Sequence, residues 1–515
     1  MSVMHLTQAP VRGALMKGKR VALACGDQTL TWSQFLDRIT RVAGVLRDVG
    51  VGPDVAVSML ADTCFEYFDY HYAVPWVGGV LVPMNTRLSD PEMIHILNDA
   101  EVKVLICGPE YAHRLPALKA GAQHLHTVIG IGLPEEALDY ETLWRARAPV
   151  DDVRRGGEDR LSLIYTGGTT GLPKGVETTH ANTIANLLAA IPNIEFHEDM
   201  VYLHSMPVFH TAGSARIFGT VTALGTGVLL PRFDLGAMLQ AIEQHRVTHI
   251  LAVPTMLNRL LNHPDFARTD FSSVTNLSYG ASIMPEALLR RALELLPRVR
   301  FTQSYGMTEL SPSAAYLQPK YHVLEGPHAG RLKSIGQPIH TAEIRIADEH
   351  DNELPRGEVG EIHVRGPMVM KGYWKQPELT AKTLRGGWMH TGDAGWMDEE
   401  GFIYLVDRLK DMIITGGENV YSGEVENALH EHPAVRECAV IGLPHEDFGE
   451  TVHAIVVLHE GSPVTEQELI QHCRRLIAHY KCPRTLEFRT EALPLSGTSK
   501  ILKRQLREEV LQRGA

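Results

Sequence analysis

The feature that most constrains this chain is the recurrence of short apolar runs, each followed by a glycine-rich turn and a helical pattern. Residues 102–107, 161–165, 249–253 and 274–279 are runs of this kind, with the length and composition of buried strands. After the last run, Gly280 and Pro285 precede leucines at helical spacing, which predicts a helix packed on a sheet. This alternation predicts a doubly wound α/β architecture, with ligands at the carboxyl ends of the strands.

The texture of the sequence changes twice towards the C-terminus. From residue 335, short alternating segments broken by glycine and proline predict a small antiparallel β subdomain. After the charged stretch at 407–411, an amphipathic helix from residue 423 and a strand at 437–443 predict a separate α+β unit. We therefore expect an N-terminal domain at 1–407, made of two doubly wound α/β lobes and the β subdomain. A small mobile α+β domain at 408–515 would follow it, with the charged stretch as a candidate hinge.

Composition sets the class of partner and the compartment. The 515 residues carry a formal charge of −12, which disfavours nucleic acid or an anionic membrane as the main partner. The six cysteines are dispersed without Cys-x-x-Cys spacing, as in a reduced cytosolic protein. The N-terminus shows no secretory signal, and the longest apolar stretch, at 73–84, is broken by proline and glycine. We expect a cytoplasmic protein without an integral membrane segment.

The most informative segment is YTGGTTGLPKG at 165–175, directly after a predicted strand. Its glycines allow backbone N–H groups to converge on an anion, its threonines offer hydroxyls, and Lys174 adds a cation. It is not a Walker loop, because Pro173 separates Gly171 from the lysine and no hydroxyl residue follows. Taken alone, the segment fits a phosphate-binding loop and a flexible surface loop equally well.

Further motifs follow in a fixed order, namely PVFH at 207–210, SYGMTE at 304–309, GEIHVRG at 360–366, TGD at 391–393, GGEN at 416–419 and SGTSKI at 496–501. In order and spacing they resemble the acyl-adenylate-forming superfamily, which includes AMP-forming acyl-CoA synthetases, luciferases and peptide-synthetase adenylation domains. The resemblance covers essentially the whole chain. It implies an enzyme that joins a carboxylate to ATP, forms acyl-AMP and pyrophosphate, and transfers the acyl group to a thiol, with ATP, Mg²⁺ and coenzyme A as cofactors.

The resemblance implies a nucleotide site in which the glycine-rich loop holds the β,γ-phosphates, a backbone turn and an aromatic ring sandwich adenine, and a carboxylate with an arginine holds the ribose. The corresponding residues are Thr166, Gly167, Gly168, Thr169, Thr170, Gly171, Lys174, Gly280, Ala281, Ser282, Tyr305, Gly306, Asp393 and Arg408. Gly167 stands where the family usually has serine, so one hydroxyl is missing from the loop.

The residues that match the catalytic positions are Lys500, Glu309, Thr308 and His210. Lys500 matches the adenylation lysine, whose ammonium stabilises the charge that builds up between carboxylate and α-phosphate. Thr308 matches the α-phosphate contact, and Glu309, together with Thr169, matches the metal site, where a hard oxygen donor suits Mg²⁺. The glycine that usually precedes the lysine is displaced, because Ser499 occupies its position.

The acyl group of the substrate is expected beside His210, which would gate the acyl pocket and the tunnel through which the pantetheine arm of coenzyme A enters. The positions that match the acyl pocket are His210, Thr211, Ala212, Gly213, Tyr279, Ser304, Ser311 and Pro312. None is lysine or arginine, which disfavours a dicarboxylic acid, with Arg216 one turn further along as the single reservation. The side chains are small or neutral, which favours a medium- or long-chain fatty acid or an arylalkanoate.

The resemblance also places the second half-reaction in the C-terminal domain. Gly416 and Gly417 match the pantetheine tunnel, Phe448 matches an aromatic residue that packs on that arm, and Arg87 weakly matches a CoA-phosphate contact. Lys410 matches the hinge.

The sequence favours a free-standing acyl-CoA synthetase, because no carrier-protein motif follows the lysine segment. A 4-hydroxycinnamate- or benzoate-type aryl-CoA ligase and a module that loads a carrier protein stay as alternatives, and a homodimer is left open.

Overall fold

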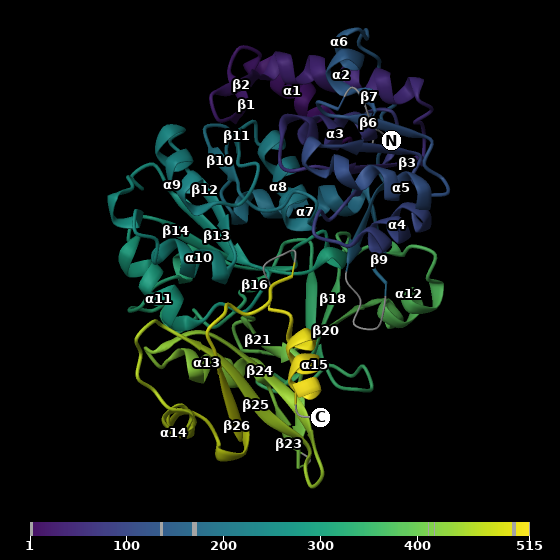
Figure 1. Ribbon diagram of the computed structural model, residues 1–515. Coiled ribbons are helices and arrows are strands. Elements are labelled where there is room, and N and C mark those ends of the chain that lie inside the picture. The colour runs from purple at the N-terminus through teal and green to yellow at the C-terminus, as the bar shows by residue number, and fades with distance from the viewer. Residues whose placement is uncertain are drawn as a thin grey trace.

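The computed structural model describes residues 4–133, 137–166, 172–409, 411–416, 418–496 and 501–513. Within these residues the chain forms four sheets, two of them large and mixed (Figure 1). The first large sheet has the strand order β16 (Gln337–Pro338), β15 (Ala315–Leu317), β14 (Arg300–Tyr305), β13 (Asn276–Gly280), β12 (His249–Ala252), β10 (Val201–His204), β11 (Thr226–Leu229), β1 (Val21–Cys25) and β2 (Gln28–Thr31).

The second large sheet is also parallel in its centre, with antiparallel strands at one side. Its order is β19 (Gly372–Tyr373), β9 (Lys174–Thr179), β8 (Arg160–Thr166), β4 (Val80–Pro83), β3 (Ala56–Leu60), β5 (Val104–Cys107), β6 (Thr127–Gly130) and β7 (Leu138–Asp139). Its central strands β3, β4 and β5 are buried along their whole length, which explains why they read as continuous apolar runs.

Two smaller sheets follow. A small antiparallel sheet holds β17 (Glu343–Ala347), β18 (Gly360–Arg365), β20 (Met389–Met397) and β21 (Ile403–Arg408). The C-terminal sheet holds β23 (Glu418–Val420), β22 (Ile413–Thr415), β25 (Gly449–Leu458) and β24 (Val435–His445), with β26 (Thr485–Arg489) paired to β25. The C-terminal elements, green to yellow in Figure 1, lie together below the two large sheets.

Helices cover the two large sheets and the C-terminal sheet. They are α1 (Gln8–Lys17), α2 (Trp32–Asp48), α3 (Phe65–Trp76), α4 (Asp90–Asp99), α5 (Leu115–Gly121), α6 (Tyr140–Arg145), α7 (His180–Asn193), α8 (Thr211–Thr222), α9 (Leu235–Gln244), α10 (Pro254–Leu261), α11 (Glu286–Leu295), α12 (Pro377–Thr383), α13 (Ser422–His430), α14 (Glu466–Leu476) and α15 (Lys503–Arg513). Short 3-10 helices connect them, among them η3 (Thr308–Leu310). None of the helices in the described part is both long and apolar enough to cross a bilayer.

The predicted α/β class is confirmed, and the four predicted strands appear as β5, β8, β12 and β13. The helix expected near Pro285 is α11, with Pro285 as its N-cap. One expectation was wrong in detail: β16 does not belong to the small antiparallel sheet, because its backbone pairs with β15 at the edge of the first large sheet. The boundary at residue 407 stays a prediction.

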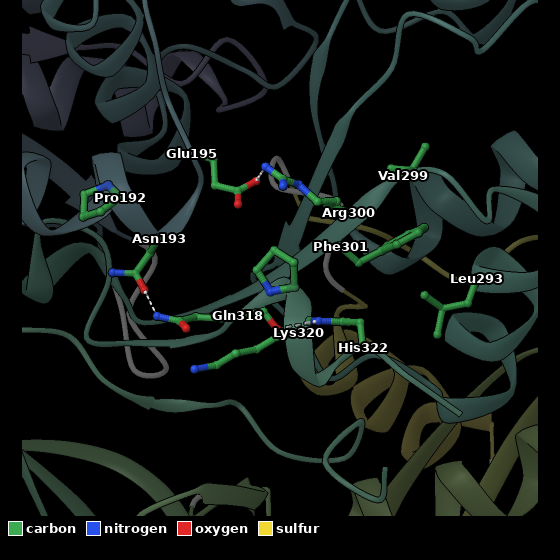
Figure 2. A pocket seen from close by; sticks show the side chains of 11 residues that line it. Pro192, Asn193, Glu195, Leu293, Val299, Arg300, Phe301, Gln318, Lys320 and His322 are labelled. Carbon is green, nitrogen blue, oxygen red and sulfur yellow. Dashed lines mark hydrogen bonds and ion pairs between the residues drawn. The ribbon is translucent and has the colours of Figure 1, made fainter. Parts of the chain in front are cut away.

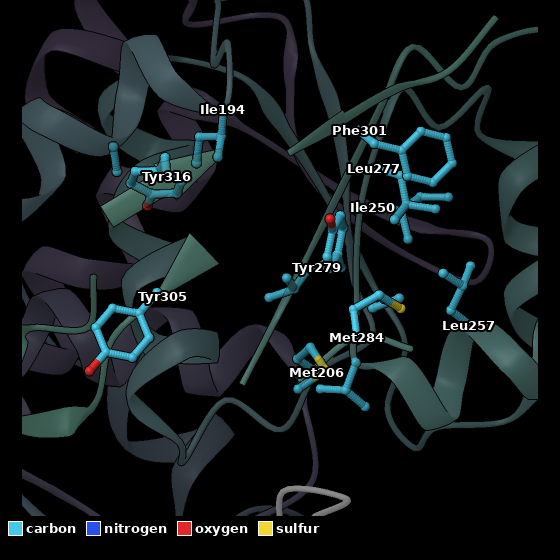
Figure 3. Close-up of a cluster of buried hydrophobic side chains, with 14 of the residues drawn as sticks. Ile194, Met206, Ile250, Leu257, Leu277, Tyr279, Met284, Phe301, Tyr305 and Tyr316 are labelled. Carbon is cyan, nitrogen blue, oxygen red and sulfur yellow. The ribbon is translucent and has the colours of Figure 1, made fainter. Parts of the chain in front are cut away.

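A hydrophobic cluster that includes side chains of the first large sheet fixes the strands that lead to the site (Figure 3). Leu277, Tyr279 and Phe301 are almost fully buried in it and come from β13 and β14. These two strands are parallel, so Gly280 and Ser304 end side by side. The carboxyl ends of both strands are therefore held rigidly where a doubly wound fold binds its ligand.

Candidate active site

The described part of the phosphate segment is the base of a hairpin between β8 and β9. Thr166 ends β8 and is paired with Lys174, which begins β9. The Oγ1 atom of Thr166 is buried and has no hydrogen-bond partner among the described residues. The ammonium group of Lys174 lies 3.8 Å from the centre of the Tyr373 ring, in a cation–π contact. The described base of the hairpin thus carries a cation and a buried hydroxyl on two paired residues.

Glu309 lies beside that lysine. It sits in η3 and is 4% exposed, and its Oε1 lies 4.0 Å from the Nζ of Lys174. The hydroxyl of Tyr373 donates a hydrogen bond of 2.8 Å to the same oxygen. Burial and then the charge of Glu309 raise the pKa of Tyr373 above its usual range, so the phenol stays a donor. The predicted phosphate lysine and the predicted metal carboxylate are therefore neighbours.

Tyr373 was missing from the sequence-based prediction. No spacing rule connects residue 373 with residue 309, and the contact arises because β19 pairs with β9, with Tyr373 opposite Val176. That pairing joins the edge of the second large sheet to the strand that carries Lys174.

The predicted ribose corner lies on two adjacent strands of the small antiparallel sheet. Asp393 on β20 lies opposite Arg408 on β21, and the Nε of Arg408 is 2.7 Å from Oδ1 of Asp393. The hydroxyl of Tyr305 donates to Oδ2 at 2.7 Å. Burial and then Asp393 raise the pKa of Tyr305 well above its ordinary value. The structure thus brings the predicted adenine-stacking tyrosine and both predicted ribose residues into one network.

Arg408 interacts electrostatically both with Asp393 and Tyr305 and with Glu309, which lies beside Lys174. Burial lowers the pKa of Arg408, but Asp393, Tyr305 and Glu309 raise it more, so the net shift is upward. A single guanidinium is therefore within electrostatic range of both the predicted ribose carboxylate and the predicted metal carboxylate.

The predicted adenine shelf has no room for side chains at its glycines. A Cβ on Gly280 would lie 2.3 Å from the carbonyl oxygen of Ser304, and one on Gly306 would lie 2.0 Å from that of Pro312. Ala281 follows Gly280 with a φ of 69°, in the left-handed region. Ser282 continues the same turn. The turn and the end of β14 therefore approach each other as closely as backbone allows.

The predicted acyl residues cluster at the start of α8. His210 is the N-cap of this helix, and its Nδ1 accepts a hydrogen bond of 3.4 Å from the N–H of Ala212. Thr211 is buried, and a Cβ on Gly213 would meet the carbonyl oxygen of Pro207 at 2.2 Å. The hydrogen bond to Ala212 therefore holds the His210 ring in a defined orientation at the N-terminus of α8.

The other predicted acyl residues are more deeply placed. Tyr279 is completely buried in the cluster of Figure 3, and its hydroxyl forms a 2.9 Å hydrogen bond with Nε2 of His322. Ser304 bonds Ser313, with 2.8 Å between their hydroxyl oxygens. Ser311, followed by Pro312, caps η3 in the left-handed conformation.

In the C-terminal region, two of the predicted coenzyme A residues meet. The N–H of Gly416 donates to the carbonyl of Phe448 at 2.9 Å, and the guanidinium of Arg484 stacks 3.8 Å from the Phe448 ring centre. Arg87 lies elsewhere, and its guanidinium donates to the carbonyl of Ser496 at 3.0 Å. Arg87 thus contacts the segment that leads to Lys500.

Several predicted site residues lie outside the described residues. They are Gly167, Gly168, Thr169, Thr170, Gly171, Lys410, Gly417 and Lys500. Their roles stay predictions.

A separate pocket opens beside the amino end of β14, at the opposite end of the strands from Gly280. About 440 Å³ of space is lined by residues that include Asn193, Arg300 and His322 (Figure 2). Glu195 pairs with Arg300 at its rim, and Asn193 bonds Gln318. No predicted site residue lines it, so it is distinct from the nucleotide corners.

Comparison with known proteins gives a consistent result. The family model described as AMP-binding enzyme matches residues 12–374, and the AMP-binding enzyme C-terminal domain matches residues 424–500. Feruloyl-CoA synthase of Amycolatopsis sp is 39% identical over 97% of both chains. A long-chain-fatty-acid–CoA ligase of Mycobacterium tuberculosis is 35% identical over 94% of this chain and 93% of its own.

Solved structures agree. The o-succinylbenzoate CoA synthetase of Bacillus subtilis, in complex with its acyl-adenylate intermediate, superimposes with a TM-score of 0.86 at 31% identity. That match covers 98% of this chain and 99% of the other.

The fold and the two family-model matches define an adenylate-forming enzyme. The chain belongs to the AMP-binding enzyme family. It is an ATP-dependent, AMP-forming acid–CoA ligase, as its resemblance to the acyl-CoA synthetases predicted.

Proposed function

We propose that the protein activates a neutral monocarboxylic acid, either a medium- or long-chain fatty acid or an arylalkanoate, and transfers the acyl group to coenzyme A. The observation that carries this proposal is the joint placement of Lys174, Glu309 and Arg408 at one site. The positive charge of Lys174 is opposite to that of a polyphosphate, the Glu309 carboxylate can bind a metal ion, and Arg408 can contact a ribose hydroxyl. The relatives support both acyl classes, because one is named for feruloyl-CoA and another for long-chain fatty acids.

The reaction has two steps. A carboxylate oxygen of the acid attacks the α-phosphorus of ATP, and pyrophosphate leaves, which produces acyl-AMP. The thiol sulfur of coenzyme A, once it has lost its proton, then attacks the acyl carbonyl carbon, and AMP leaves with the original carboxylate oxygen. In our proposal Thr308 contacts the α-phosphate, and Lys500 stabilises the charge that builds up during the first step.

The nucleotide would be held by groups that the structure already orients. Asp393 would accept from ribose hydroxyls in addition to its bonds from Arg408 and Tyr305, since a carboxylate can accept about four hydrogen bonds. Lys174 would neutralise the terminal phosphates. Tyr305 and the Gly280 turn would enclose adenine between a ring and a backbone.

The residues present fit a magnesium ion. Glu309 offers a hard carboxylate oxygen beside the phosphate lysine, which suits an ion that takes most of its ligands from phosphate and water. When bound, Mg²⁺ would neutralise phosphate charge. Tyr373 would keep the Glu309 carboxylate oriented towards it.

We further propose that residues 408–515 form a domain that rotates about Lys410 between the two steps. Lys500 would face the phosphates in one orientation, and Gly416 and Gly417 would line the pantetheine tunnel in the other. Arg87 would contact the coenzyme A phosphate once Ser496 moves away from it. A cytoplasmic location stays a prediction from the sequence.

A carboxylic-acid panel tests the proposed substrate class. Octanoate, palmitate, phenylpropionate, malonate and succinate are each incubated with ATP, Mg²⁺ and coenzyme A, and pyrophosphate release is followed. We expect turnover of the neutral monocarboxylic acids and not of malonate or succinate. A clear preference for malonate would contradict the proposal.

A further inference from the structure

Two histidines lie directly opposite each other on the small antiparallel sheet. His363 is on β18 and His390 is its partner on β20, and their ring centres are 3.8 Å apart. His363 is completely buried and His390 is 9% exposed. Two protonated imidazoles at this distance would repel each other strongly in a buried setting, so we expect neutral rings, each with one nitrogen lone pair.

One carboxylate fixes which nitrogen of each ring carries the hydrogen. Oε2 of Glu361 lies 3.2 Å from Nε2 of His363 and 3.1 Å from Nδ1 of His390. Burial raises the pKa of Glu361, but hydrogen bonds from both histidines and from the N–H of Gly392 lower it to about 2, so the group is ionised. An ionised carboxylate only accepts, and both of these nitrogens therefore donate. Nδ1 of His363 and Nε2 of His390 keep the lone pairs.

The lone pair of His390 faces an acid without a hydrogen bond. Its Nε2 is buried and has no hydrogen-bond partner among the described residues, and Oδ1 of Asp351 lies 3.8 Å from it. Asp351, His363 and His390 each offer one ligand atom, and these three atoms lie within 4.8 Å of one another. Donor atoms bound to one tetrahedral zinc ion at about 2.1 Å lie about 3.4 Å apart. Side-chain movements on the order of 1 Å would therefore bring all three atoms to one ion.

The hydrogen bonds around the pair are those of a metal site. A histidine that binds a metal ion usually donates its other ring N–H to a carboxylate, which fixes the ring and makes the free nitrogen more basic. Glu361 accepts from both rings in this way. Two imidazoles and one carboxylate, with water in the fourth position, are a ligand set that suits Zn²⁺.

Two guanidinium groups also contact the cluster. Arg385 donates to both oxygens of Asp351 at 2.9 Å, but a carboxylate can accept about four hydrogen bonds, so Asp351 keeps lone pairs. Arg345 donates to Nδ1 of His363 at 3.4 Å and lies over the Trp388 ring, 4.5 Å from its centre. An ion that binds His363 must displace Arg345 from this nitrogen, and the contact with Trp388 can hold the arginine afterwards. Arg345 is therefore a competitor of the metal ion.

We propose that Asp351, His363 and His390 form a binding site for Zn²⁺, with Glu361 as the carboxylate that orients both imidazoles. The site is separate from the predicted Mg²⁺ position at Glu309, which offers an oxygen donor and no imidazole. It needs neither nucleotide nor acid, so it stands or falls independently of the proposed function.

Metal titration of the full-length enzyme, without nucleotide, tests the inference. Zn²⁺ binding is measured by calorimetry after treatment with a chelator, and Co²⁺ serves as a spectroscopic probe, because it absorbs visible light far more strongly with four ligands than with six. We expect a Co²⁺ spectrum of the four-ligand type that Zn²⁺ abolishes at one equivalent per chain. An enzyme that shows no such spectrum and binds no Zn²⁺ would overturn the inference.

Loss-of-ligand variants locate the ion. His390→Gln should abolish the Co²⁺ spectrum, and Glu361→Gln should weaken Zn²⁺ binding by about 10- to 100-fold, the usual effect of removing a carboxylate that orients a metal-binding histidine. His472→Gln is the matched control, because His472 belongs to another close pair, with its ring centre 5.0 Å from that of His432. A His390→Gln enzyme with the wild-type spectrum would overturn the inference.

A variant that should gain affinity guards against misfolding as an explanation. Arg345→Met removes the group that competes for Nδ1 of His363 and keeps an unbranched side chain beside Trp388. We expect Zn²⁺ to bind about 2- to 10-fold more tightly, the usual effect of one hydrogen bond. A partly unfolded preparation cannot produce this gain. An Arg345→Met enzyme that binds Zn²⁺ no more tightly than the wild type would contradict the assignment of His363 as a ligand and overturn the inference.

Discussion

Removal of one hydroxyl group tests the arrangement around Glu309. In Tyr373→Phe the ring that contacts Lys174 is kept, and only the 2.8 Å hydrogen bond to Glu309 is lost. Glu309 is 4% exposed, so water cannot simply replace the phenol. The nearest remaining partner is the Nζ of Lys174, 4.0 Å away. We expect the carboxylate to turn towards the lysine, which would withdraw both groups from ATP.

The size of the effect follows from the bond removed. A hydrogen bond to a charged group contributes about 1.5–3 kcal/mol, which corresponds to roughly 10- to 100-fold in kcat/KM for ATP. The assay measures pyrophosphate release while ATP and Mg²⁺ are varied separately, and the Mg²⁺ requirement should rise. Tyr404→Phe is the matched control, since its hydroxyl bonds Arg331 away from the site. A folded Tyr373→Phe enzyme with ATP and Mg²⁺ dependence within twofold of wild type would refute the reasoning.

Three further predictions concern the half-reactions, the adenine shelf and acid stability. The rate of adenylation should fall by about 10²–10³-fold in Lys500→Ala, which should still convert added acyl-AMP to acyl-CoA. Gly417→Leu should instead release pyrophosphate but make little acyl-CoA. Equal loss of both steps in Lys500→Ala would contradict the assignment. Gly280→Ala should lower the free energy of unfolding, measured by urea denaturation, by about 1–3 kcal/mol and weaken ATP binding. Gly52→Ala is the control, because a Cβ there meets nothing within 4 Å, and it should denature like the wild type. Burial lowers the pKa of His71 to about 4, below its unfolded value of about 6.5. The contribution of neutral His71 to the free energy of unfolding is therefore complete above about pH 6.5 and is lost as the pH falls towards 4. Urea denaturation should show falling stability over that range, and a flat profile would contradict this.

The sequence could predict what depends on local pattern. The strand at 276–280 and helix α11 follow from apolar runs, a turn and a proline, and all three signals are local. The residues of the predicted ribose corner followed from motifs, because the family resemblance matched Asp393 and Arg408 individually, and the structure places them opposite each other on β20 and β21.

The contacts that the sequence could not predict are those made by pairing between distant segments. Tyr373 reaches Glu309 only because β19 joins the edge of the second large sheet. Arg216 stood outside the predicted acyl pocket, since helical spacing alone does not show whether a side chain faces a cavity or the core. Its burial is visible only in three dimensions, as is the lack of a hydrogen-bond partner for its Nε among the described residues.

Transfer of oxygen isotope tests the central claim most directly. The acid is labelled with ¹⁸O in both carboxylate oxygens, and the products are analysed by mass spectrometry after a complete turnover with ATP and coenzyme A. Because a carboxylate oxygen attacks the α-phosphorus and stays there when the thiol displaces AMP, the account predicts that each AMP formed carries a single ¹⁸O atom. Label in inorganic phosphate, or AMP without label, would contradict an acyl-adenylate intermediate.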